Sequence, residues 1–159
     1  MKHILLITIA AVVLVGCGEV SSNLNLYEAA ESGDIETVKK HLNDGVDIEL
    51  KCAGCGSTAL GHAAKKGHKE IAKLLISKGA DVNASDEEGR VPLHFAAANS
   101  QKEIAELLIS KGANVNAKLE PSDIFIVLTP LDMAEDETTI DLLRKHGGKT
   151  GEELKAESN

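Results

Sequence analysis

The sequence predicts an all-α protein in which short helix–turn–helix repeats stack side by side to form a solenoid. Three observations predict this fold class. Blocks of residues recur after 33 positions, since residues 57–64 align with 90–97 and residues 69–84 align with 102–117. Each copy contains a segment with the apolar spacing of a helix that buries one face. A glycine follows that segment, where a left-handed residue commonly ends a helix.

The two central copies carry the motif that identifies the repeat. The second copy opens with Val91-Pro-Leu-His-Phe-Ala96, and both copies continue with Lys-Glu-Ile-Ala-x-Leu-Leu-Ile-Ser-Lys-Gly-Ala. The opening motif resembles the Thr-Pro-Leu-His-x-Ala signature of the ankyrin repeat, whose period is also about 33 residues. The resemblance implies helix pairs joined by β-hairpin fingers. Each repeat is then stabilised mainly by its neighbours in the stack.

The helices of the central repeats share an apolar stripe and a closing glycine. On the second helix, the stripe at i, i+3 and i+4 consists of Ile71, Leu74 and Leu75 in one copy and of Ile104, Leu107 and Leu108 in the other. On the first helix, the pairs Ala63-Ala64 and Ala96-Ala97 allow a close approach of neighbouring helices. Gly79 and Gly112 follow the second helices, and we expect a left-handed backbone at both.

The histidine of the motif has a structural role in the family. The resemblance implies that His94 hydrogen-bonds neighbouring backbone and holds the finger turn. In the preceding copy Gly61 stands at this position and His62 follows it. We therefore expect the brace to be missing from that repeat, with His62 packed or at the surface.

Two weaker copies flank the central ones and act as caps. Lys40 stands where the central copies have leucine, and the last copy follows a five-residue insertion. The sequence thus predicts an ankyrin-repeat domain over 25–149, with repeats at about 25–56, 57–89, 90–128 and 129–149. Residues 150–159 form a C-terminal capping tail. Its Thr150-Gly-Glu-Glu153 segment fits the capping box of a short final helix, the alternative being a frayed polar tail.

The N-terminal segment predicts export and lipid anchoring. A basic Lys2 precedes the apolar run 4–15, which is shorter than the roughly 20 residues of a spanning helix. Leu14-Val15-Gly16-Cys17 resembles the lipobox of bacterial lipoproteins. The resemblance implies a lipoprotein signal peptide over 1–16, lipidation of Cys17, and a tether to residue 24. Because Gly18 and not Asp follows the cysteine, we expect the outer membrane, facing the periplasm. An ordinary cleaved signal is the alternative.

The composition argues against nucleic acid as a partner. The formal charge is −8, Trp is absent, and the aromatic residues are Tyr27, Phe95 and Phe125. Nucleic-acid-binding proteins use basic patches and aromatic platforms. Because aromatic residues are so few, the core must be aliphatic. The partner is expected to be a protein.

Cys52-Ala-Gly-Cys55 is the motif of the chain that most suggests a reactive or bonded pair of side chains. We expect a local disulfide that stiffens the finger, because an exported protein meets an oxidising compartment. Thiol-redox catalysis is an alternative, although it needs the first cysteine at a helix N-terminus. A zinc site would need further ligands; His62 or His68 could lie nearby, but nothing in the sequence fixes their geometry. The expectation is therefore no metal and no cofactor.

The remaining sequence indicates a binding protein and not an enzyme, with no small-molecule substrate. Ankyrin stacks bind through the finger tips and the exposed first helices, which form the concave face. The resemblance assigns this face to Ser57, Lys65, Lys66, Glu87, Glu88, Arg90 and Asn99, together with Gly54, Cys55 and Ala98. The apolar run 124–128, with Ile124 and Phe125, either folds onto the neighbouring helices or forms an exposed contact strip. A toxin or enzyme inhibitor and a structural envelope spacer are narrower alternatives.

Overall fold

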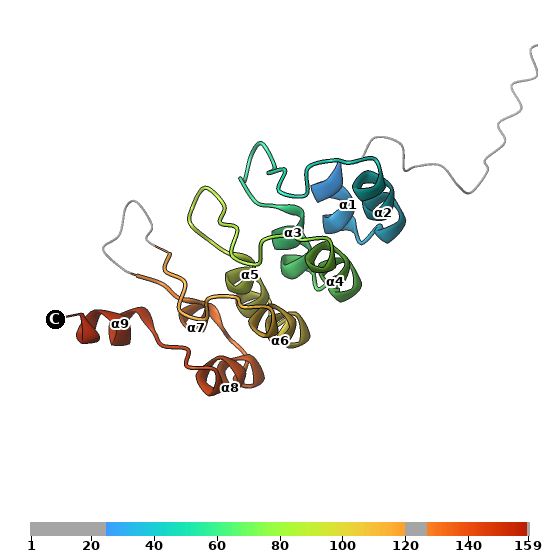
Figure 1. The fold of residues 1–159 in the computed structure, drawn as a ribbon. Coiled ribbons are helices and arrows are strands. Elements are labelled where there is room, and N and C mark those ends of the chain that lie inside the picture. The colour runs from blue at the N-terminus through green and yellow to red at the C-terminus, as the bar shows by residue number, and fades with distance from the viewer. Residues whose placement is uncertain (1–24, 120–126, 159) are drawn as a thin grey trace, which may run out of the picture.

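The structure is a computed structural model that describes residues 25–119 and 127–158. Its helices lie in a curved row (Figure 1). They are α1 (Leu26–Ser32), α2 (Ile35–Asn43), α3 (Ala59–Lys66), α4 (Lys69–Ser77), α5 (Pro92–Ala98), α6 (Lys102–Ser110), α7 (Pro130–Met133), α8 (Glu137–Lys145) and α9 (Gly151–Glu157). The expected all-α solenoid is confirmed. The signal peptide, Cys17, its tether, Ile124 and Phe125 lie outside the described residues.

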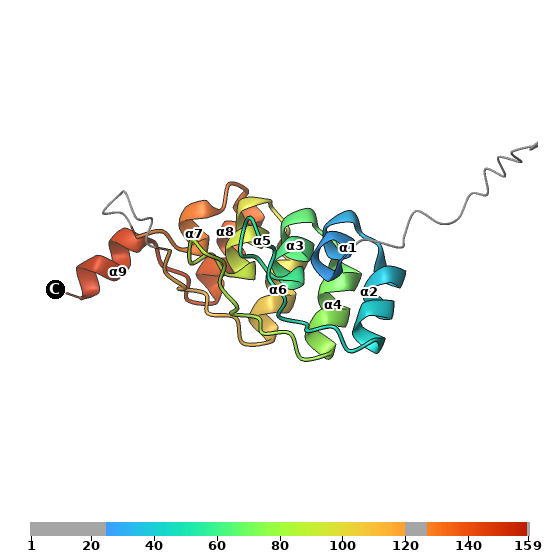
Figure 2. The same cartoon turned by 90° about the horizontal axis from the view of Figure 1, so that it is seen from above.

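The helices form two layers. The first helices of the pairs, α1, α3, α5 and α7, stand in one row, and the second helices α2, α4, α6 and α8 stand in another (Figure 2). Each of the four expected repeat segments holds one pair. The first helices pack onto one another more extensively than the second helices do. The stack therefore curves, with the first helices and the fingers on its concave side.

Small side chains explain this curvature. Ala63, Ala64, Ala96 and Ala97 are all 0% exposed, so their helices approach as closely as the alanine pairs predict.

The apolar stripe on the second helices is narrower than expected. The isoleucines and the second leucines of the two stripes are buried, whereas Leu74 and Leu107 are only half-buried. The fully buried Ala72 and Ala105 complete the buried face of these helices.

The turns between repeats are fixed by backbone conformation and by side-chain amides. Gly79 and Gly112 have φ values of 96° and 89°, which confirms the expected left-handed ends. Beyond them, each turn is hydrogen-bonded to the next. The Asn83 amide donates to the carbonyl of Gly112 over 3.2 Å and accepts from the Asn114 N–H over 2.8 Å. Asn116 makes the same pair of bonds to residues 147 and 149.

Each finger is named here after the repeat that it enters. Single bridges join Lys51 to Thr58 in the second finger and Leu119 to Leu128 in the fourth. In the third finger, His94 Nδ1 accepts a hydrogen bond from the Val91 N–H over 3.1 Å, so the expected brace is confirmed. Burial lowers the pKa of His94 from 6.5 to about 4, and the backbone of Leu128 and Ala117 opposes this shift. The ring is therefore neutral at physiological pH.

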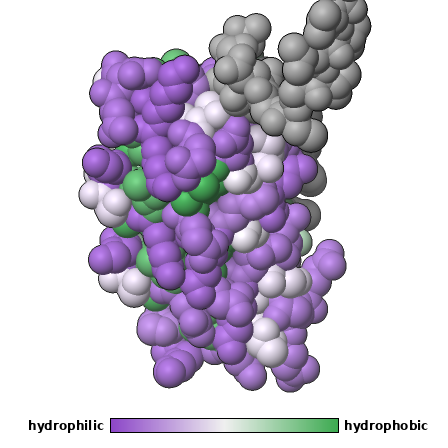
Figure 3. All heavy atoms as spheres, turned by 90° about the vertical axis from the view of Figure 1, so that its right-hand side faces the viewer, coloured by the Kyte–Doolittle hydropathy of each residue, from purple (hydrophilic) through white to green (hydrophobic). Residues whose placement is uncertain are grey.

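Both ends of the stack are polar. Figure 3 views the N-terminal end, where hydrophilic side chains predominate around a smaller group of apolar ones. Lys40 is exposed there, as its place in a cap predicts. At the other end, α9 begins with the expected capping box between Thr150 and Glu153. Gly151 anchors this helix, since its N–H donates to Asp132 over 2.8 Å and its Cα lies against the Val127 carbonyl.

Candidate functional site

The second finger is a tight turn built on Cys52 and Cys55. Its two ends are joined where the Cys52 N–H donates to the Ser57 carbonyl over 3.0 Å. Gly56 has a φ of 62°, and its N–H donates to the Cys52 carbonyl over 2.9 Å. The Cys55 N–H points at the Cys52 sulfur over 3.1 Å. Cys52 and Cys55 form a disulfide, with their Cα atoms 5.6 Å apart.

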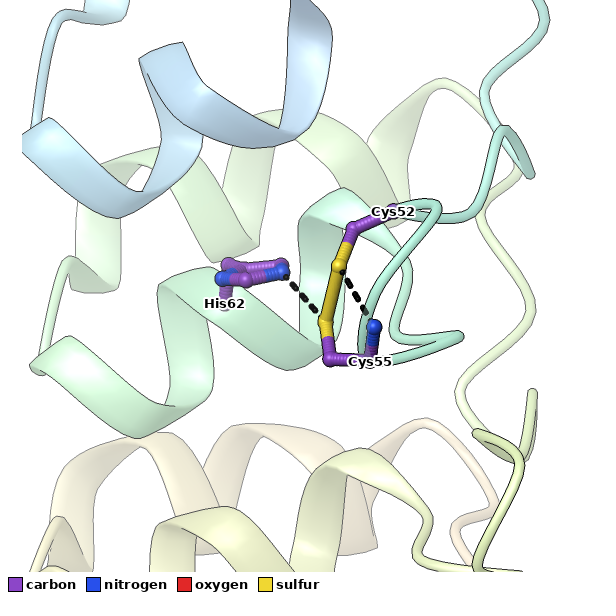
Figure 4. Close-up of side chains that lie close together, drawn as sticks. All are labelled: Cys52, Cys55 and His62. Carbon is purple, nitrogen blue, oxygen red and sulfur yellow. Dashed lines mark hydrogen bonds between the residues drawn. A yellow bond between two sulfur atoms is a disulfide. The ribbon is translucent and has the colours of Figure 1, made fainter.

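His62 on α3 brings an imidazole to this disulfide (Figure 4). Its Nε2 lies 3.4 Å from the Cys55 sulfur. On the other side of the ring, Nδ1 lies 3.4 Å from a carboxylate oxygen of Glu31 on α1, and the ring stacks on Tyr27 at 5.8 Å between centroids. The residue is only 8% exposed. Burial lowers the pKa of His62, and the Glu31 carboxylate partly opposes this effect.

The two sulfurs and the imidazole therefore form one cluster. Their ligand atoms all lie within 4.8 Å of one another, and no fourth Cys, His, Asp or Glu of the described residues joins them. Sequence reasoning left open whether His62 or His68 lies near the cysteines. The structure selects His62, because the Nε2 of His68 instead contacts the Glu31 carbonyl at 3.0 Å.

The position of the cysteines bears on the redox alternative. Cys52 lies in the finger, and α3 begins only at Ala59. The helix N-terminus that lowers the pKa of the first cysteine in thioredoxin-type proteins is therefore remote from it. His62 contacts the disulfide from α3, and sequence reasoning missed its partner Glu31. No local signal could have indicated Glu31, because it belongs to another repeat.

The concave face contains one fixed arginine. Arg90 Nε donates to Asp86 over 2.7 Å, and its NH1 lies 3.0 Å from Glu88. The guanidinium stands over the Phe95 ring at 5.1 Å from the centroid. The Asp86 side chain is 0% exposed, whereas that of Arg90 is 25% exposed. This buried carboxylate also accepts the N–H groups of residues 88 and 90, so it holds both the turn and the arginine.

The other expected face residues fall into two groups. Lys65, Lys66, Glu87 and Asn99 are exposed, with Lys66 Nζ 3.3 Å from Glu31. Ser57 is only 6% exposed, so the expectation that it offers surface to a partner is wrong. Its hydroxyl lies against Gly61, where a Cβ would overlap it. The serine is covered because the chain turns into α3 directly after it.

A small cavity of about 30 Å³ lies beside the cluster. It is lined by Cys55, Ser57, Gly61, His62, Lys65, Arg90 and Phe95. Gly61, which stands where the family places a histidine, adds no side chain to this lining, and the Ser57 hydroxyl lies against it. The cavity thus connects the sulfur–imidazole cluster to the concave face at Arg90.

The chain matches one family model and many curated proteins. Residues 26–118 match a model described as ankyrin repeats (3 copies). An ankyrin repeat-containing protein of Schizosaccharomyces pombe is 33% identical over 43% of this chain and 33% of its own length. Protein phosphatase 1 regulatory subunit 12A of Mus musculus is 43% identical over 38% of this chain and 6% of its own. Protein phosphatase 1 regulatory subunit 27 of Homo sapiens is 40% identical over 42% and 43%, respectively.

The chain spans less than half the length of each of these relatives. The family match ends at residue 118, so the fourth helix pair and α9 lie beyond it. Within residues 25–119 and 127–158, every helix is too short or too polar to cross a membrane.

Proposed function

Since the chain belongs to the ankyrin-repeat family, we propose that it binds a protein partner through its concave face and is anchored to a bacterial membrane by lipidated Cys17. Ankyrin repeats indicate protein–protein interaction in general. The concave face is defined here by Lys65, Lys66, Glu87, Glu88, Arg90 and Asn99. Regulatory subunits among the relatives support a binding role over a catalytic one.

The fixed arginine is the observation that carries this proposal. Arginine is enriched among the residues that dominate binding energy. Asp86, Glu88 and Phe95 hold the guanidinium in one place, so binding costs little side-chain entropy. Charges of both signs surround it, because Lys65 and Lys66 lie on α3 and Glu87 lies on the third finger. We therefore expect a partner surface that is polar and carries charges of both signs.

Crosslinking followed by affinity capture tests the face. The triple variant Lys66→Ala, Glu88→Ala, Arg90→Ala should lose the partner recovered with the unchanged chain. Loss of one interfacial hot spot weakens binding by at least ~2 kcal/mol, or roughly 30-fold. The matched control changes exposed residues of the second helices, Lys73→Ala, Glu106→Ala and Lys145→Ala. Equal recovery with both triple variants would refute the face.

Truncation of Arg90 leaves the Asp86 carboxylate buried without its cation, which can unfold the chain. A second variant therefore tests the face with this ion pair intact. Lys65→Glu with Glu87→Lys changes two exposed side chains and leaves the Asp86–Arg90 pair intact. This variant should also lose the partner while keeping the thermal midpoint of the unchanged chain.

The lipid anchor is supported by residues 14–17 and by the apolar run before them. Several acyl chains on one residue give stable anchoring, whereas one chain gives marginal binding. The tether from residue 19 to 24 reaches on the order of 20 Å, so the repeats would stay close to the bilayer. We propose the outer membrane, facing the periplasm, as the location.

Fractionation and mass spectrometry test the anchor. The unchanged chain should sediment with membranes and begin at an acylated Cys17. Cys17→Ser should leave the membrane fraction or keep its signal peptide. If Cys17→Ser fractionated with membranes and had the same N-terminus as the unchanged chain, the anchor would be wrong, while the concave face would be unaffected.

A further inference from the structure

We infer that, when its disulfide is reduced, the second finger binds one Zn²⁺ ion through Cys52, Cys55 and His62, with Glu31 orienting the imidazole. This site adjoins the proposed concave face, and it adds a metal-binding activity to the binding module.

The ligand types and their separations fit zinc. Two thiolates and one imidazole form a known three-residue ligand set, which leaves the fourth position to water or another donor. A tetrahedral ion with Zn–S near 2.3 Å and Zn–N near 2.0 Å separates its ligand atoms by roughly 3.5–3.8 Å. His62 Nε2 already lies 3.4 Å from the Cys55 sulfur, and all three ligand atoms fall within 4.8 Å. The Cα separation of 5.6 Å lets both sulfurs face one ion.

The finger backbone is arranged to stabilise a thiolate. The Cys55 N–H points at the Cys52 sulfur over 3.1 Å, and hydrogen bonds to sulfur favour its anionic form. Gly56 follows the second cysteine with a φ of 62°, a conformation that other residues rarely adopt. This turn places both sulfurs on the side of the finger that faces α3 (Figure 4).

The surroundings of His62 supply the outer shell of such a site. A metal-bound histidine usually donates its other ring N–H to a carboxylate or carbonyl. His62 Nδ1 lies 3.4 Å from Glu31 and has no hydrogen bond in the disulfide form, although it is buried. Lys66 holds the other oxygen of Glu31 at 3.3 Å. The cavity of about 30 Å³ beside Cys55 and His62 offers room for about one water molecule, which fits the open fourth position.

An external thiol supplies the electrons and protons that convert the disulfide into the zinc site. Two molecules of a thiol, RSH, reduce the Cys52–Cys55 bond and leave as RSSR, so that two electrons and two protons reach the cysteine sulfurs. Zn²⁺ then binds both sulfurs as thiolates and releases these two protons. The disulfide and the zinc ion therefore exclude each other.

Metal titration of the full-length chain carrying Cys17→Ala, which removes the third thiol, tests the inference. After reduction under anaerobic conditions, the chain should bind one Zn²⁺ with a dissociation constant below about 1 µM in competition with a chromophoric chelator. Co²⁺ in place of Zn²⁺ should give thiolate-to-metal charge-transfer absorption. The oxidised chain should do neither.

Variants distinguish the loss of a metal ligand from the loss of the fold. Cys52→Ser with Cys55→Ser should abolish binding, and His62→Gln should weaken it by more than tenfold. Glu31→Gln should weaken it by about 10- to 100-fold, as loss of an outer-shell partner does, and Glu31→Asp should restore part of the affinity. The exposed His146→Gln is the matched control. Circular dichroism without metal checks that each variant is folded.

Three results would overturn the inference. The reduced chain could bind Zn²⁺ no better than the double serine variant. A folded His62→Gln chain could keep the full affinity, which would leave only a flexible dithiol. Co²⁺ could bind without the charge-transfer band, which would place the metal on residues other than the cysteines.

Discussion

Acid should destabilise this fold through His94, at a pH where carboxylates are still ionised. Burial lowers the pKa of His94 from 6.5 to about 4, so the folded chain keeps the ring neutral while the unfolded chain protonates it. The unfolded state then binds more protons between these two pKa values, and stability falls as the pH falls through that window. The two values imply a loss of about 2 kcal/mol between pH 7 and pH 5.

Urea denaturation followed by circular dichroism measures this loss. We compare the unchanged chain with His94→Asn, whose side-chain oxygen can still accept the Val91 N–H. The variant should lose about 2 kcal/mol less than the unchanged chain does between pH 7 and pH 5. Burial also lowers the pKa of His62, and both chains share that contribution. The exposed His146→Asn is the control, and an unchanged pH dependence in His94→Asn would refute the reasoning.

Three further perturbations test the packing. Leu108→Ala should cost about 2–5 kcal/mol in urea unfolding and more than Leu107→Ala, because only Leu108 is fully buried; equal losses would contradict the burial pattern. Gly151→Ala should raise amide exchange throughout α9, because the new Cβ would overlap the finger backbone; unchanged protection would show that this contact is not formed. Reduction of Cys52–Cys55 without metal should lower stability by about 2 kcal/mol, and an unchanged thermal midpoint would mean that the finger does not need the bond.

The helix pairs could be predicted from the sequence because their causes are local and periodic. The stripe of Ile71 and Leu75, the alanine pairs and the closing glycines all act within a few residues of one another. The structure puts Ala72 into the buried face and leaves Leu74 half-buried. The spacing of apolar residues cannot show which of Ala72 and Leu74 is more buried, because burial depends on the next repeat and not on the helix itself.

The contacts between repeats were beyond the reach of the sequence. Asn83 and Asn116 hydrogen-bond turns about one repeat away, and nothing in the pattern distinguishes them from ordinary turn residues. Ser57 is a different case, because its contact is local. Its family position suggested a finger tip, but its hydroxyl lies against Gly61 and the residue is only 6% exposed. The spacing of the residues does not show how the chain turns into α3, and this turn sets the exposure of Ser57.

The second repeat departs from the ankyrin signature at the histidine position, and the structure places a cysteine and the displaced histidine next to that position. Gly61 stands where the family has the bracing histidine, so this finger lacks the bond that His94 makes in the next repeat. Thr58 caps α3 instead, and the cysteine pair closes the finger above it. His62, displaced by one residue, points back to the sulfur and not to the finger backbone. The same shift that removes the structural brace therefore creates the sulfur–imidazole cluster. The cluster therefore joins a disulfide that stiffens the finger to the imidazole that the proposed zinc site would use.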